Sequence, residues 1–196
     1  MATASHPISV PAQRPRVLVV GTMFVLAAIV MVFAALIGIY LTMRSGVVSS
    51  GGTWLPSGVT IPLTQPNTNM FTLLMGAVTV QWAVYAIARD DRINAYLALG
   101  LTLVLGFMFI VTQSYLWSIM DLDISGSPQA VLLYTVGGAH MAFLVGTMAF
   151  LVLMGIRALG GQFTSRQHDG ISSAALSWHV MTAVYFVIWI AVYITK

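Results

Sequence analysis

Five long apolar runs, separated by short polar stretches, make up most of the chain. They cover residues 17–43, 70–88, 93–120, 129–156 and 171–195. The last run contains no Asp, Glu, Lys or Arg, and a helix of its length, rising about 1.5 Å per residue, crosses a hydrocarbon layer about 30 Å thick. The pattern predicts an all-α fold, an integral membrane bundle of five transmembrane helices that forms a single domain over residues 17–196.

The polar stretches predict how these helices are joined. Residues 1–16, with three prolines and two arginines, predict a flexible tail. Residues 44–69 are rich in Gly, Ser, Thr and Pro and predict an aqueous loop, with Trp54 at the membrane interface, where indole rings are enriched. Residues 89–92 read Arg-Asp-Asp-Arg and leave room only for a tight turn between antiparallel helices.

The distribution of the eight Lys and Arg residues predicts the orientation in the membrane. With five spans, six of these residues lie on the side of the N-terminus, and Arg44 and Lys196 lie on the other side. Loops rich in Lys and Arg remain in the cytoplasm. We therefore expect the N-terminus and its tail to be cytoplasmic, and the C-terminus to lie outside.

Composition excludes several classes of protein. Hydrophobic residues make up 59% of the chain and charged residues only 7%, a balance that fits a protein embedded in lipid. Because the chain has no cysteine, it can form neither a disulfide nor a thiolate nucleophile. The net charge of +3 comes from scattered arginines rather than from a basic patch, so a nucleic-acid partner is not expected.

Candidate chemistry within the spans is confined to two histidines, His140 and His179. Every aspartate lies in a predicted loop and there is no glutamate, which argues against a proton-coupled transporter. Two histidines on different helices could ligate a haem or a metal ion, and a haem would make the chain a membrane electron-transfer protein. The other interpretation is that each histidine bonds to a neighbouring helix or a lipid head group. We favour this second interpretation, since nothing in the sequence places the two histidines at a similar depth in the membrane.

Glycines in the fourth run predict close packing of its helix. Gly137 and Gly138 precede His140, and Gly146 follows eight residues after Gly138. Small residues let neighbouring helix backbones approach each other closely. Packing therefore explains these glycines better than a functional role does.

The stretch from Phe163 to His179 carries the most specific pattern in the chain. It resembles subunit III of the haem-copper oxidases, in the short five-helix bacterial form. Residues that match the family's pattern are Phe163-Thr164-Ser165, His168, Gly170, Ala174-Ala175 and Trp178-His179, and upstream Gly138-Ala139-His140. The resemblance extends over nearly the whole chain from Val17 onward.

The chain also departs from the family's pattern at its ionisable positions. Ile29 and Ser172 stand where the family usually has glutamates, and Thr182 stands where it has an aspartate. A second histidine expected after His140 is replaced by Phe143. This loss of intramembrane carboxylates suggests a divergent member of the family. Its complex is then a quinol oxidase or a nitric oxide reductase, with a cytochrome c oxidase as the other possibility.

The resemblance implies an accessory, non-catalytic subunit of a proton-translocating terminal oxidase in the bacterial cytoplasmic membrane. Its implied roles are to stabilise the catalytic subunit, to bind phospholipid and to support proton uptake and turnover. Its expected partners are oxidase subunits I and II and phospholipids, with membership of a larger respiratory assembly left open. Haem and copper are expected in the partner subunits and no cofactor or metal in this chain. The residues to which the resemblance assigns lipid-binding or structural roles are His140, Trp178, His179, His168 and Arg166.

Overall fold

The computed structural model describes residues 16–55, 59–120, 122–124, 126–163 and 168–195. These residues form five α-helices and no strand: α1 (Val17–Ser49), α2 (Thr64–Ala88), α3 (Arg92–Ile119), α4 (Pro128–Leu159) and α5 (Asp169–Ile188), which continues into the π-helical segment η1 (Trp189–Ile194). Each of the five is long and apolar enough to cross a membrane. The predicted all-α five-span fold is confirmed, whereas the predicted N-terminal tail lies outside the described residues, up to residue 15.

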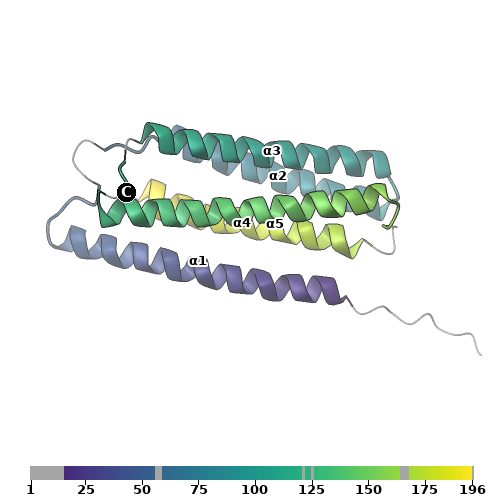
Figure 1. The fold of residues 1–196 in the computed structure, drawn as a ribbon, viewed down its shortest axis with the longest axis horizontal. Helices are drawn as coiled ribbons and strands as arrows, with labels where there is room; N and C mark the ends of the chain where they lie inside the picture. Colours follow the sequence, from purple (N-terminus) through teal and green to yellow (C-terminus); the bar gives the residue numbers. More distant parts are fainter. Residues whose placement is uncertain (1–15, 56–58, 121, 125, 164–167, 196) are drawn as a thin grey trace, which may run out of the picture.

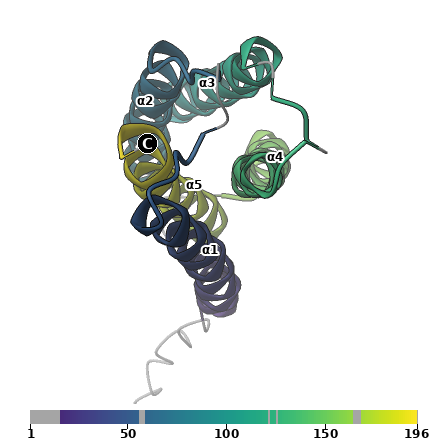
Figure 2. The ribbon, with the colours of Figure 1, turned by 90° about the vertical axis from the view of Figure 1, so that its left-hand side faces the viewer.

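The helices lie roughly along one long axis, and the C-terminal end is found at the same end of the bundle as the α1–α2 connection (Figure 1). Seen along that axis, α2 and α3 lie side by side, α4 stands apart across the bundle, and α1 packs outside α5 (Figure 2). Helix α5 contacts α1, α2 and α4, and most of its membrane-spanning residues are buried. The C-terminal helix is therefore the central packing element.

The connection between α1 and α2 is shorter than predicted. Helix α1 continues to Ser49 and α2 begins at Thr64, so the expected loop over 44–69 is wrong at both of its ends. The Ser45 hydroxyl donates to the Thr42 carbonyl at 2.9 Å, and the Thr68 hydroxyl donates to the Thr64 carbonyl at the same distance. Such bonds satisfy the hydroxyl side chains within these helix ends, although the composition of the two segments is typical of a loop.

Trp54, in the connection between α1 and α2, packs against α1. Its side chain is buried rather than placed at the surface of the bundle, and its indole N–H donates to the Tyr40 hydroxyl at 2.9 Å. The two rings meet edge to face with centroids 5.3 Å apart. Its burial follows from the hydrogen-bond partner on α1, which lets the indole enter the core. The depth of Trp54 at the membrane interface stays a prediction.

Side-chain caps mark the starts of α3 and α4. The Asp91 carboxylate accepts hydrogen bonds from the backbone and side-chain nitrogens of Asn94, at 3.1 and 2.6 Å. These bonds hold the pKa of Asp91 below its usual value. The Ser127 hydroxyl accepts from the Ala130 N–H at 3.2 Å, and Pro128 occupies the first turn of α4. The tight turn predicted between the second and third helices is present, with Asp90 in the left-handed region at φ 59°.

Candidate functional site

Trp178 lies at the centre of the bundle. It is fully buried, and its indole N–H donates to the Leu73 carbonyl of α2 at 3.2 Å. Glycines on two other helices leave room for the ring: a Cβ on Gly76 would collide with the indole, and a Cβ on Gly106 would lie 3.1 Å from its Cη2. Trp178 is thus a packing residue that joins α5 to α2 and α3.

His140 is enclosed by aromatic rings. The rings of Phe33, Phe109 and Tyr185 lie with centroids 6.1, 5.4 and 5.1 Å from the imidazole. Nε2 of His140 lies 2.9 Å from the Met181 carbonyl oxygen. Because a carbonyl only accepts, Nε2 carries the proton and the imidazole is in its Nε2–H tautomer when neutral. The bond ties α4 to α5.

His179 faces a different helix. Its Nε2 lies 3.1 Å from the Oε1 of Gln81 on α2, and both residues are only partly buried. His140 and His179 therefore hold separate partners, a backbone carbonyl in one instance and a side-chain amide in the other. This arrangement supports a structural role for each histidine rather than a ligand held between the two imidazole rings.

The remaining two residues named from the sequence lie before α5. His168 is partly buried, and its carbonyl accepts from the Ser172 N–H at 3.1 Å, which begins α5. Arg166 lies outside the described residues.

A buried polar pair on α2 and α3 was not predicted. The Asn69 side chain donates to the Gln113 Oε1 at 2.9 Å, and both residues are almost fully buried. Gln113 falls within the third predicted run, whereas Asn69 was assigned to the end of the loop. A signal was available at Gln113, because an amide within an apolar run requires a partner in a membrane.

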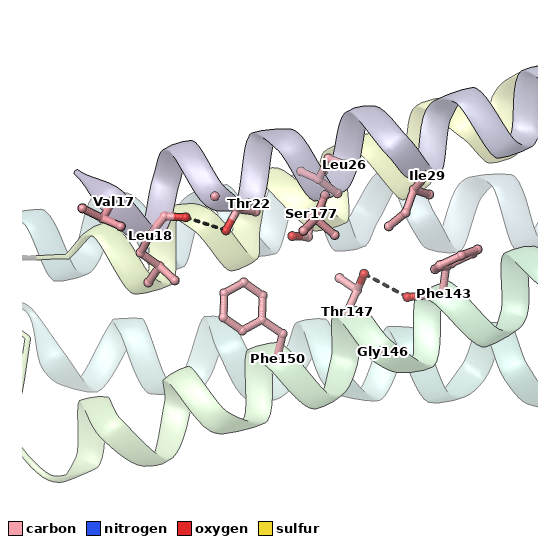
Figure 3. A pocket seen from close by; sticks show the side chains of 12 residues that line it. Val17, Leu18, Thr22, Leu26, Ile29, Phe143, Gly146, Thr147, Phe150 and Ser177 are labelled. Carbon is pink, nitrogen blue, oxygen red and sulfur yellow. Dashed lines mark hydrogen bonds between the residues drawn. The ribbon is translucent and has the colours of Figure 1, made fainter. Parts of the chain in front are cut away.

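An apolar groove of about 550 Å³ opens between α1, α4 and α5 (Figure 3). Three hydroxyl side chains line it, and each is already bonded to a backbone carbonyl of its own helix: Thr22 to Leu18, Thr147 to Phe143 and Ser177 to Ser173. The groove therefore offers an apolar surface with its polar groups satisfied. Its lining residues are Val17, Leu18, Gly21, Thr22, Val25, Leu26, Ile29, Phe143, Gly146, Thr147, Phe150 and Ser177.

Two departures from the resembled family meet in this groove. Ile29 and Phe143, which occupy the positions of an expected glutamate and an expected histidine, both line it. Gly146 also lines it, and a Cβ there would find nothing within 4 Å. The close packing predicted at Gly146 is therefore wrong. Gly137 does face a neighbour, since a Cβ built on it would lie 3.3 Å from Cζ2 of Trp117.

The described residues thus form a multi-pass helical membrane bundle, in which no group of three or more His, Cys, Asp or Glu side chains is arranged to hold a metal ion. The chain belongs to the cytochrome c oxidase subunit III family, whose sequence pattern matches residues 11–196. The resemblance inferred from the sequence is confirmed.

Relatives from several organisms agree with this assignment. The chain is 29% identical over 174 residues to cytochrome c oxidase subunit 3 of Chondrus crispus, over 87% of this chain and 64% of the relative. It is 28% identical over 173 residues to that of Paracentrotus lividus, over 87% and 66%. It is 31% identical over 145 residues to that of Coturnix japonica, over 73% of this chain and 56% of the relative. The chain therefore spans about two thirds or less of the length of these relatives.

Proposed function

We propose that this chain is an accessory subunit of a haem-copper terminal oxidase and has no redox centre of its own. Membership of the subunit III family supports the assignment. The described interior supports it as well, since its histidines are engaged in bonds between helices. The proposed location is the cytoplasmic membrane of a bacterium, with the N-terminus inside, and the proposed partners are oxidase subunits I and II.

The observation that carries the partner proposal is the bond between Gln81 and His179. Both side chains are partly exposed on the outside of the bundle and within membrane-spanning helices. Polar groups at this depth are costly to expose to lipid. Val78, Trp82 and Tyr85 lie on the same stripe of α2 and are exposed as well. We propose that subunit I covers this α2–α5 face.

The variant His179→Ala tests the interface in the complete complex. It removes the polar contact that the proposed interface covers, so we expect less of the large haem- and copper-containing subunit to co-purify with the tagged chain. The assembled fraction should begin oxygen reduction at the normal rate and lose activity sooner during turnover.

The matched control for that experiment is Ser114→Ala, which changes an exposed side chain on α3. It should leave recovery of the large subunit and turnover lifetime unchanged. Equal recovery for both variants, or an immediate loss of oxygen reduction in fully assembled His179→Ala complex, would contradict the proposed role.

We further propose that the groove between α1, α4 and α5 holds an acyl chain of a membrane phospholipid. Its apolar lining and its satisfied hydroxyls favour a hydrocarbon occupant over a polar one. Ile29 and Phe143 in the lining extend this surface where the resembled family carries ionisable groups.

Filling the groove tests the lipid proposal. Gly146→Phe places a ring in the groove, and mass spectrometry of the purified complex should show less retained phospholipid. Gly100→Phe on α3 is the control, because a Cβ there also meets nothing within 4 Å but Gly100 does not line the groove. Equal lipid retention in the two variants would rule out the groove as the binding site.

The electron donor is a separate question, which the reduced-minus-oxidised spectrum of the co-purified complex answers. Its haem types distinguish a cytochrome c oxidase from the quinol oxidase and nitric oxide reductase alternatives. A haem band retained by the chain after its partners are removed would replace the accessory-subunit proposal by the electron-transfer one.

A further inference from the structure

Unpartnered polar atoms gather between α2, α3 and α4, in the half of the bundle that contains the C-terminus. Gln113 and Trp117 lie one turn apart on α3, so their side chains share a face. Within the described residues, neither the Gln113 Nε2 nor the Trp117 Nε1 has a hydrogen-bond partner, although both atoms are buried. The Tyr193 hydroxyl lies beside the Gln113 amide without meeting hydrogen-bond geometry. A buried donor left without an acceptor is destabilising, so each of the two nitrogens requires one.

Gly137 of α4 leaves space next to both nitrogens. A Cβ built on Gly137 would lie 3.7 Å from Gln113 Nε2 and 3.7 Å from Trp117 Nε1. Both nitrogens therefore lie at the same short distance from one point beside α4. The chain itself supplies no atom there, because residue 137 has no side chain.

We propose that Gln113, Trp117 and Gly137 form a binding site for one buried water molecule that links α3 to α4. The water oxygen accepts one hydrogen bond from each nitrogen. Buried waters in proteins commonly satisfy polar groups in this way, and they need a small polar space with two to four partners.

Two further buried acceptors belong to neighbouring residues: Asn69, whose amide bonds to Gln113, and His140, three residues after Gly137 on α4. Asn69 Oδ1 and His140 Nδ1 are buried and have no partner among the described residues. Nδ1 of His140 is an acceptor because its Nε2 faces the Met181 carbonyl and carries the proton. Both are acceptors, the kind of group to which the water can donate its own protons.

The direct test is a cryo-EM map of the whole oxidase complex at a resolution that shows ordered waters. We expect a density peak at about 2.7 to 3.2 Å from both Gln113 Nε2 and Trp117 Nε1. The competing arrangement rotates the Gln113 amide so that its oxygen accepts directly from Trp117. A map with that direct contact and no peak would overturn the proposal.

Three variants give an independent readout, the temperature at which this chain is released from the purified complex. Gly137→Ala places a carbon in the water site and leaves both donors without an acceptor. Gly138→Ala is its control, since a Cβ there comes no closer than 4.0 Å to the Trp117 ring and brings the same gain in helix propensity. We expect a lower release temperature for Gly137→Ala than for Gly138→Ala.

Gly137→Ser separates hydrogen bonding from crowding. It carries the same Cβ as Gly137→Ala, 3.3 Å from Trp117 Cζ2, and adds a hydroxyl that accepts from the two nitrogens in place of water. Its release temperature should exceed that of Gly137→Ala. Equal values for the serine and alanine variants would show that no acceptor is needed at this position and would also overturn the proposal.

Discussion

The interior is organised around large side chains that fit against residues without side chains. Trp178 comes from α5, whereas the space for its ring comes from Gly76 on α2 and Gly106 on α3. The indole N–H then reaches a backbone carbonyl, that of Leu73. In a membrane, where lipid is as apolar as the core, such close packing and hydrogen bonding stabilise the association of helices.

A methyl group at Gly76 tests this fit. Its Cβ would lie 2.7 Å from Cε2 of Trp178, so Gly76→Ala must displace a fully buried ring. We expect a loss of about 1 to 3 kcal/mol in the free energy of unfolding, typical of overpacked cores. Gly100→Ala, where a Cβ meets nothing within 4 Å, should show no such loss. Reversible unfolding of both variants in detergent measures the difference.

At this scale the sequence identified important side chains but not their partners. His140, Trp178 and His179 were named from the pattern, and all three form bonds between helices. Two of the acceptors are backbone carbonyls, which every residue has, so the sequence carries no residue type that would predict them. The third acceptor, Gln81, is a side chain, but only the packing of α2 against α5 brings it to His179.

Individual helices are defined by their ends as much as by their apolar runs. Asp91 and Ser127 each cap the helix that follows, and each lies two residues before the start of a predicted run. The end of α1 and the start of α2, in contrast, extend into the segment whose composition predicts a loop. Propensity favours loops there, and contacts within the helix and with the bundle override it.

The cap of α4 gives a prediction at this scale. Ser127→Ala removes the acceptor for the Ala130 N–H and should lower the free energy of unfolding by about 1 kcal/mol. Ser127→Asp keeps an acceptor at this position and should therefore retain most of that stability. Denaturant titration of the two variants in parallel checks this. Equal losses would show that the hydrogen bond contributes nothing measurable.

Across the whole molecule, burial is distributed unevenly among helices of similar composition. In the apolar window of α1 only 11% of residues are buried, against 56% for the window of α5. Helix α1 packs mainly on α5 and α4, and the groove opens along it. Apolar residues suit lipid and protein core equally, so composition could not tell which helix is central.

The orientation of the bundle is a prediction at the same scale, and the lack of cysteine makes it accessible to labelling. Ser50→Cys lies just after α1, and Gly160→Cys lies just after α4 at the other end of the bundle. With the N-terminus inside, a membrane-impermeant maleimide should label Ser50→Cys in intact cells and Gly160→Cys only after the membrane is permeabilised. The reverse pattern would invert the proposed orientation.

The sequence by itself determined the fold class, the number of spans and the family, because apolar run length and a contiguous motif are local properties of the chain. Only the tertiary structure decided which side chains contact each other and which ones lie on the outside of the bundle. The pair of Asn69 with Gln113, the burial of Trp54 and the open side of Gly146 depend on contacts between residues far apart in sequence. In lipid, polarity alone does not sort residues into inside and outside, so the packing of the helices has to do so.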